Sequence, residues 1–116
     1  MGDISEHFSR AEFACRCRCG FDEINPRLVE ILEEVRNHFD LPCKVNSGCR
    51  CIEHNRIVRG APRSQHLLGN AADVVIKGVS PALVAEAAIL YGATGTKVYN
   101  TFTHIDVRPG DEWHEH

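Results

Sequence analysis

The sequence lacks the features that mark several large classes of protein. Its formal net charge is only −3, so it offers no broad positive field for nucleic acid or for an anionic membrane surface. No apolar run approaches the roughly 20 residues that a membrane-spanning helix needs. The N-terminal residues 1–7 lack the basic and apolar regions of a signal peptide. These absences argue against nucleic-acid binding and a membrane span, and they favour a cytoplasmic protein.

What is present is a composition typical of one folded domain. Hydrophobic residues make up 43% of the chain and charged residues 25%, which are ordinary values for a globular protein. A chain of 116 residues supports one modest hydrophobic core but not two. We therefore predict a single domain over residues 1–116, with its core between about residues 8 and 110, and we expect a monomer.

The six cysteines lack the C-x-x-C spacing of a structural zinc knuckle. They fall into an early C-x-C-x-C run and a later cluster. The members are Cys15, Cys17 and Cys19, followed by Cys43, Cys49 and Cys51. Such thiols stay free or bind a metal in a reducing compartment, and they pair in an oxidising one. Under oxidising conditions we favour a disulfide between the two groups over a structural zinc site, and the sequence leaves the pairing open.

Two segments have the pattern of helices that pack on a core. The first starts at Asn25-Pro26, where asparagine can cap the helix and proline suits its first position. Apolar residues then recur at spacings of three and four until Leu41-Pro42 ends the segment. The second helix covers residues 81–91 and starts in the same way at Ser80-Pro81. Shorter helical turns are expected at residues 9–14 and 52–58.

Short runs rich in β-branched and aromatic residues predict the strands. A tight turn at Asn100-Thr101 joins the last two of them into a hairpin. The predicted strands cover residues 43–47, 73–76, 95–99 and 102–108.

Residues that bind metals occur in two of these segments. His66 and Asp73 lie seven positions apart, too far for the helical H-E-x-x-H arrangement, and Gly69 bends the chain between them. Asp73 leads an apolar strand, where a carboxylate is costly unless it is hydrogen-bonded or binds a metal. His104 and Asp106 share one face of the last strand because side chains alternate. Two imidazoles and a carboxylate form a known catalytic zinc set with a fourth position for water.

Arg50 is a candidate for binding an anionic group. It follows a predicted strand and Gly48, and it precedes the segment with the metal-binding residues. A lone arginine is by default a surface residue, but a guanidinium binds a carboxylate through two parallel hydrogen bonds. His54 could be a further metal ligand, although a single histidine in a polar turn is more typical of a surface residue.

The motif Ser64-x-His66-x-x-Gly69-x-Ala71-x-Asp73, followed by a strand with His104, resembles the signature of the zinc D-alanyl-D-alanine carboxypeptidase family. That family includes phage endolysin peptidases and is related in fold to the hedgehog signalling domain. The turn Ser47-Gly48-x-Arg50, the pair His54-Asn55 and residues 8–15 also resemble its short bacterial and phage branch. The resemblance covers residues 8–110.

This resemblance implies an α+β fold with a small antiparallel sheet and two main helices, as in hedgehog and DD-peptidase domains. It implies a zinc ion bound by His66, Asp73 and His104. Arg50 would lie near the substrate carboxylate or the scissile carbonyl, and Ser64 and Gln65 would shape the pocket. The substrates would be D-amino-acid-containing stem peptides of peptidoglycan, cut by a carboxypeptidase or an endopeptidase. A phage member could also reach the cell wall without a signal peptide.

Two positions depart from the family pattern. Better-studied members carry an acid three residues before the last histidine as the general base, and here that residue is Thr101. No acidic residue occurs between Glu86 and Asp106, so we assign Asp106 as the base. The alternative, that Asp106 orients a ligand histidine, stays open. Cys49 stands where relatives often have an aromatic residue.

The missing acid also keeps a different class of function open. A zinc-stabilised module that binds the cell wall without cleaving it would need the ligands but no base. A structural or thiol-redox domain built on the cysteines is a weaker rival, because it leaves the histidines and Asp73 unexplained.

Overall fold

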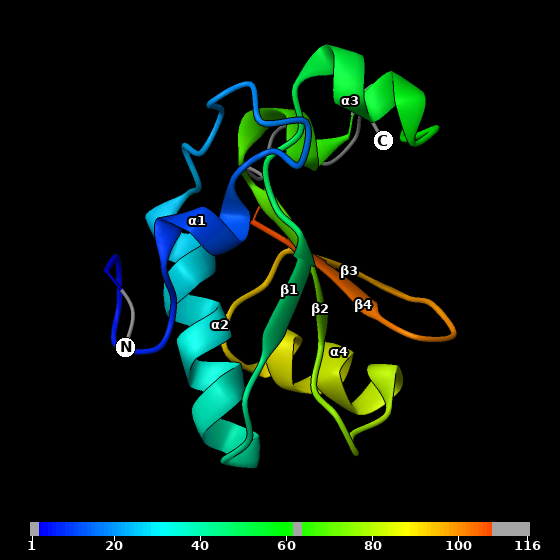
Figure 1. Ribbon diagram of the computed structural model, residues 1–116. Helices are drawn as coiled ribbons and strands as arrows, with labels where there is room; N and C mark the ends of the chain where they lie inside the picture. The colour runs from blue at the N-terminus through cyan, green and yellow to red at the C-terminus, as the bar shows by residue number, and fades with distance from the viewer. Residues whose placement is uncertain (1–2, 62–63, 108–116) are drawn as a thin grey trace.

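A four-stranded antiparallel sheet forms the centre of the computed structural model, which describes residues 3–61 and 64–107 (Figure 1). The strand order is β1-β2-β4-β3, so β2 and β4 are the two central strands. The strands are β1 (Lys44–Ser47), β2 (Ala71–Val75), β3 (Gly95–Val98) and β4 (Thr103–Asp106). The predicted antiparallel α+β fold and its C-terminal hairpin are thereby confirmed. Residue 108 of the last predicted strand lies outside the described residues.

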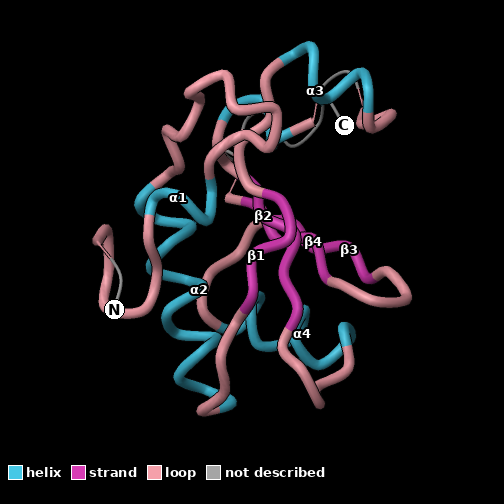
Figure 2. The backbone as a smooth tube through the Cα atoms, viewed as in Figure 1, coloured by secondary structure: helices cyan, strands magenta, loops and turns pink. Residues whose placement is uncertain are grey.

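Helices lie at both ends of this sheet. Figure 1 shows α3 at one end and α4 at the other, with α2 running beside the sheet. The tube in Figure 2 shows how much of the chain between these elements is loop, above all before α2 and around α3. The helices are α1 (Arg10–Phe13), α2 (Pro26–Phe39), α3 (Ile52–Ile57), α4 (Pro81–Leu90) and the short 3₁₀ helix η1 (Gln65–Leu68). Among the described helices, none is long and apolar enough to span a membrane.

The two main helices begin as their sequences predict. The side chain of Asn25 accepts a hydrogen bond from the backbone N–H of Arg27 over 2.8 Å, and Ser80 accepts one from Leu83 over 3.3 Å. Helix α2 ends at Asp40, whose left-handed backbone (φ 53°) closes the last turn. Its apolar face is buried in the core, and each such side chain contributes about 1.5–3 kcal/mol to folding. The buried residues of α2 are Leu28, Val29, Ile31, Leu32 and Val35.

The N-terminal segment packs onto α2 as part of the core. Phe8 and Phe13 are buried, with ring centroids 5.8 Å apart. The backbone N–H of His7 donates to Glu33 on α2 over 2.6 Å. Burial works to raise the pKa of Glu33, but hydrogen bonds from Ser5 and from the His7 backbone outweigh it and lower that pKa. The segment is therefore held by both apolar and polar contacts.

Strand β2 begins two residues earlier than predicted. Ala71 and Ala72 are fully buried and pair with Asp106 and Ile105 of β4. Alanine is not typical of strands, so the run of β-branched residues did not predict that Ala71 and Ala72 belong to β2. Asp73 consequently lies inside the strand, directly opposite His104 on β4.

Candidate metal centre

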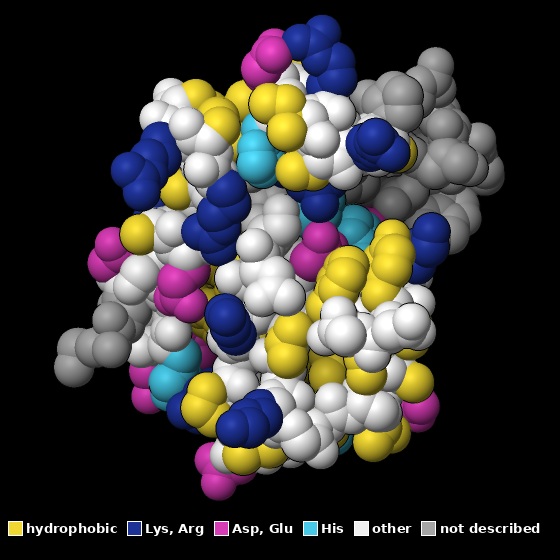
Figure 3. Space-filling view, turned by 45° about the vertical axis from the view of Figure 1, so that its right-hand side comes forward, with side chains coloured by type: hydrophobic (Ala, Val, Ile, Leu, Met, Phe, Trp, Pro, Cys, Tyr) yellow, Lys and Arg dark blue, Asp and Glu magenta, His cyan; other side chains and the backbone are white. Residues whose placement is uncertain are grey.

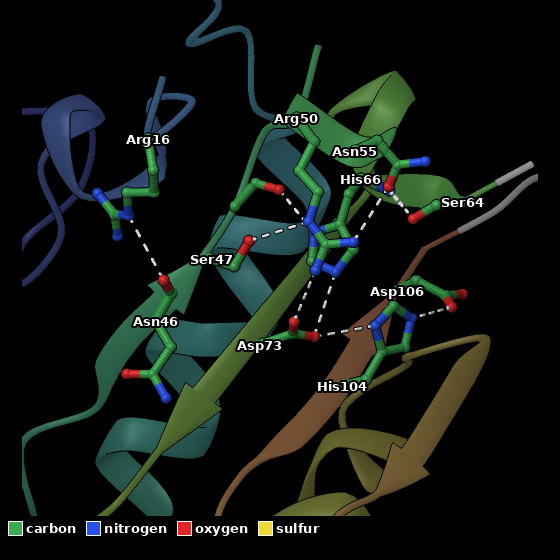
Figure 4. Close-up of polar contacts among 11 residues, drawn as sticks. Arg16, Asn46, Ser47, Arg50, Asn55, Ser64, His66, Asp73, His104 and Asp106 are labelled. Atoms are coloured by element: carbon green, nitrogen blue, oxygen red, sulfur yellow. Dashed lines mark hydrogen bonds and ion pairs between the residues drawn. The ribbon is translucent and has the colours of Figure 1, made fainter. Parts of the chain in front are cut away.

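His66, Asp73 and His104 converge on one point of the molecule. In the space-filling view, histidine, acidic and basic side chains meet near the middle of one face (Figure 3). The close-up shows both imidazoles turned toward the Asp73 carboxylate (Figure 4). Nε2 of His66 lies 3.2 Å from Oδ1 of Asp73, and Nδ1 of His104 lies 3.1 Å from the same oxygen. One ligand atom from each of the three residues lies within 4.8 Å of the others.

Two different local structures bring these residues together. Asp73 and His104 face each other because β2 and β4 pair in that register. His66 comes from η1, which ends at Gly69 with a left-handed backbone (φ 72°). A Cβ at Gly69 would also lie 2.1 Å from the carbonyl oxygen of Glu23, so any other residue would clash there. The predicted bend at Gly69 is confirmed. Its left-handed backbone and its close approach to Glu23 both favour glycine.

The proton of the His66 ring is fixed by the backbone. Nδ1 lies 2.6 Å from the carbonyl oxygen of Gly48, and His66 is 2% exposed. A carbonyl can only accept a hydrogen bond, so Nδ1 carries the proton and Nε2 turns a lone pair toward Asp73.

Asp106 fixes the ring of His104 in the same way from the opposite direction. Its Oδ2 lies 2.9 Å from Nε2 of His104, on the side of the ring away from Asp73 (Figure 4). The carboxylate is fully buried, at 0% exposure. Space for it exists because Gly95 has no side chain, since a Cβ there would lie 2.5 Å from Oδ1 of Asp106. Nδ1 of His104 is thus left with its lone pair toward Asp73.

The three converging atoms are therefore electron-pair donors that face one another. The ring protons are used by Gly48 and Asp106, so no ring proton remains to lie between Asp73 and either histidine. Burial works to raise the pKa of the Asp73 carboxyl, but the imidazoles of His104 and His66 beside it hold that pKa far below its usual range. A cation at this point would satisfy all three lone pairs. Two imidazoles and one carboxylate are a donor set that suits zinc.

Arg50 lies against the outer oxygen of Asp73. Its Nη2 is 3.2 Å from Oδ2 of Asp73, its Nη1 is 3.2 Å from Oδ1 of Asn55, and its Nε is 3.3 Å from Oγ of Ser47. The backbone N–H of Arg50 also donates to the carbonyl of His66 over 2.9 Å. These contacts hold the guanidinium rigidly and turn Oδ1 of Asp73 toward the two histidines.

A substrate can approach this set from the side of His104 and Arg50. Their side chains are 18% and 14% exposed, against 3% for His66. A cavity of about 1020 Å³ lies elsewhere, between the N-terminal segment and the start of α2, and none of its lining residues belongs to the set. The His–Asp–His set thus lies apart from that cavity.

The other sequence-predicted site residues have mainly structural contacts. Oγ of Ser64 accepts the backbone N–H of His66 over 3.2 Å and starts η1. Gln65 is buried, and its Oε1 accepts a hydrogen bond from Asn70 over 3.2 Å. His54 lies on α3 and is not part of the His–Asp–His set.

Sequence reasoning assigned no role to Asn55. This residue is buried, and it links Arg50 to the carbonyl of Ala61, to which its Nδ2 donates over 2.9 Å. Gly60 leaves room for it, because a Cβ there would lie 2.0 Å from Oδ1 of Asn55. The family resemblance includes the pair His54-Asn55, but it does not say which residue Asn55 contacts.

Comparison with known families matches residues 6–106 to the family described as Peptidase M15. The chain belongs to the peptidase M15 family. This confirms the family resemblance, which the sequence placed over residues 8–110.

Two relatives match this chain over stretches of 79 residues each. Peptidoglycan L,D-endopeptidase MepK of Escherichia coli K12 is 33% identical over 79 residues, which cover 62% of this chain and 43% of MepK. Zinc D-Ala-D-Ala carboxypeptidase of Streptomyces albus G is 34% identical over 79 residues, covering 64% of this chain and 31% of the enzyme. The matched stretch thus spans less than half the length of either relative.

A solved structure has a similar fold. The L-Ala D-Glu endopeptidase ChiX of Serratia marcescens superposes with a TM-score of 0.54 over 73% of this chain and 80% of ChiX. The sequence identity is 23%, so this likeness bears on the fold alone.

Proposed function

We propose that this chain is a zinc metallopeptidase that hydrolyses D-amino-acid-containing peptides of peptidoglycan. The observation that carries the proposal is the convergence of three lone-pair atoms beside a fixed arginine, in a chain of the peptidase M15 family. The names of its relatives describe a peptidoglycan endopeptidase and a zinc D-Ala-D-Ala carboxypeptidase. The proposal therefore covers cleavage either at the end of a stem peptide or within it.

Three side chains would hold the metal. His66 would bind through Nε2, Asp73 through Oδ1 and His104 through Nδ1, the atoms whose lone pairs converge. When bound, zinc would supply Lewis acidity to a water and to a carbonyl oxygen at the coordination position that three protein ligands leave open.

Arg50 would bind the anionic end of the substrate or the oxygen of the scissile carbonyl. Its guanidinium has five N–H donors, and its described contacts involve one acceptor at each nitrogen. Donors on Nη1 and Nη2 therefore remain for a substrate oxygen. Because Asp73, Asn55 and Ser47 already fix the group, little side-chain freedom is lost when the substrate binds. Ser64 and Gln65 would support this pocket through η1 and not by direct contact.

We assign Asp106 as the residue that orients His104, in preference to the general base predicted from the sequence. A base must reach the proton that it abstracts, directly or through one water. Asp106 is fully buried, and its Oδ2 lies 2.9 Å from Nε2 of His104, on the side of the ring away from Asp73. A carboxylate there fixes the ring and makes Nδ1 a stronger ligand.

The test is hydrolysis of purified muropeptides by the zinc-loaded protein. We expect release of D-alanine or cleaved stems, loss of activity with a chelator and recovery with zinc. His104→Ala should abolish the reaction. His38→Ala is the matched control, because it removes an imidazole that contacts Tyr91, far from the set in sequence and on another element.

Zinc binding without cleavage of any stem peptide would contradict the peptidase proposal. That result would favour the second candidate, a zinc-stabilised module that binds the cell wall. The exposed Thr101, in the turn between β3 and β4 where family members carry an acid, is the observation that keeps this candidate in place.

A further inference from the structure

Four of the six cysteines gather at one place, and none of them belongs to the His–Asp–His set. Their sulfur atoms all lie within 4.8 Å of one another. Sγ of Cys17 is 3.4 Å from Sγ of Cys15 and 3.5 Å from Sγ of Cys51. The four are Cys15, Cys17, Cys19 and Cys51.

The other two cysteines do not take part. Cys43 and Cys49 are buried in the hydrophobic core, at 8% and 1% exposure. Burial raises the pKa of the Cys43 thiol to about 12, as expected for a thiol that acts as a small apolar side chain. The fold thus divides the six cysteines into a cluster of four and two core residues.

We propose that the four clustered cysteines form a second metal site, a closed tetrathiolate site for zinc with a structural role. In a tetrahedral site with zinc–sulfur bonds of about 2.3 Å, neighbouring sulfurs lie roughly 3.8 Å apart. The separations of 3.4 and 3.5 Å are close to that value, and all six cysteines are free thiols in the structure.

A tight loop brings the first three sulfurs to one side. The backbone N–H of Arg18 donates to the carbonyl of Cys15 over 3.0 Å, and the N–H of Cys15 donates to Phe21 over 2.8 Å. Arg18 has a left-handed backbone (φ 65°), as has Gly20 (φ 95°). The chain therefore doubles back between Cys15 and Phe21, so C-x-C spacing can serve a metal here without a C-x-x-C knuckle.

Backbone donors point at the sulfurs. The N–H of Cys51 donates to Sγ of Cys15 over 3.4 Å, and the N–H of His54 donates to Sγ of Cys51 over 3.3 Å. Such donors stabilise negative charge on sulfur, and the thiolate is the form that binds metals.

The ligand type and number point to zinc in a structural role. Four thiolates fill a tetrahedral coordination sphere and leave no position for water, and soft sulfur ligands discriminate against magnesium and calcium. The ion would tie the 15–19 loop to Cys51, the residue after Arg50 and the one that starts α3. It would thus fix the backbone that carries Arg50 and Asn55.

The experiment counts metal and identifies its ligands. Protein purified under reducing conditions should hold about two zinc ions per chain, and Cys17→Ser/Cys51→Ser or His66→Ala about one. Cobalt substitution should give a sulfur-to-cobalt charge-transfer band in the wild type and in His66→Ala, but not in the double cysteine variant. Cys43→Ala is the matched control, which should keep both the band and the full metal content.

Two results would overturn the site. One is about one zinc per chain in the wild type with no sulfur-to-cobalt band. The other is a disulfide such as Cys17–Cys51, seen as fewer than six free thiols in denatured, chelated protein from reducing conditions. If the double variant fails to fold, the cobalt spectra of the wild type and His66→Ala still decide. The sulfur-to-cobalt band reports the cysteine cluster alone, so it tests this site whether or not the His–Asp–His set binds zinc and the protein cleaves peptides.

Discussion

The His–Asp–His set and the four-cysteine cluster differ in their donor atoms, in the elements that carry them and in their exposure to solvent. The first combines nitrogen and oxygen donors, two of them on the central strands β2 and β4, and its residues are at most 18% exposed in their side chains. The second has four sulfur donors on loops, and Cys17 and Cys19 are exposed. In the proposed sites, three ligands, two of them on the sheet, would leave one zinc position open for chemistry. Four sulfur ligands would close the second site and tie its loops together.

The two regions meet at the Arg50–Cys51 peptide. The Arg50 side chain contacts Asp73 of the first set, and Cys51 belongs to the second. A substitution in one region should therefore affect the other through this peptide. Metal content and kinetics should show which region was changed.

The largest expected effect is the loss of a ligand from the first set. Asp73→Ala removes the oxygen to which both histidines point and leaves the charge of Arg50 without its partner. Activity should fall by more than about 100-fold, because loss of a residue that only orients a ligand already lowers activity by about 10–100-fold. The charge-transfer band of the cobalt protein should persist, because the sulfur cluster is intact. Activity assays and cobalt spectra of the same preparation test both statements, and loss of the band would show that the regions are not independent.

Asp106→Ala separates an orienting role from that of a base. If Asp106 orients His104, zinc affinity and activity should both fall by about 10–100-fold, because the ring loses its hydrogen-bond partner. Competition with a chelator measures the affinity. Asp106→Asn should restore part of both, since its amide oxygen can still accept from Nε2. Unchanged zinc affinity with abolished activity would instead support the base.

Loss of the sulfur cluster should act on substrate binding more than on chemistry. In Cys17→Ser/Cys51→Ser we expect KM to rise by roughly tenfold or less, with a smaller change in kcat, because the backbone of Arg50 is less well held. The melting temperature should fall as well, since the metal no longer ties the 15–19 loop to α3. Steady-state kinetics and calorimetry measure these changes. A fall in kcat with unchanged KM would contradict the link through Arg50.

The smallest expected effect concerns α3, the helix that connects the two regions. Asn55→Ala should lower the free energy of unfolding by about 1–3 kcal/mol, because it removes the buried hydrogen bonds of Asn55 to Arg50 and to the carbonyl of Ala61. Arg56→Ala, on the exposed side of the same helix, should change it by less than about 0.5 kcal/mol. Urea denaturation compares the two variants, and equal effects would show that Asn55 is not a structural link.

Much of the fold was predictable because its signals are local. Asn25 and Ser80 cap helices whose proline and apolar spacing stand next to them in the sequence. The C-terminal hairpin follows from a turn between two short β-rich runs. The start of β2 was missed because alanines carry no β-strand signal, and only pairing with β4 defines Ala71 and Ala72 as strand residues.

The sequence by itself determined the identities of the three converging residues and the glycine bend that lets His66 reach Asp73. Only the tertiary structure decided which nitrogen of each ring faces Asp73, because the partners that hold the ring protons are a backbone carbonyl at Gly48 and a buried carboxylate at Asp106. It also decided that Cys51, and neither Cys43 nor Cys49, joins the C-x-C-x-C loop. Spacing along a chain limits which groups can meet, but long-range packing selects the partner and its orientation.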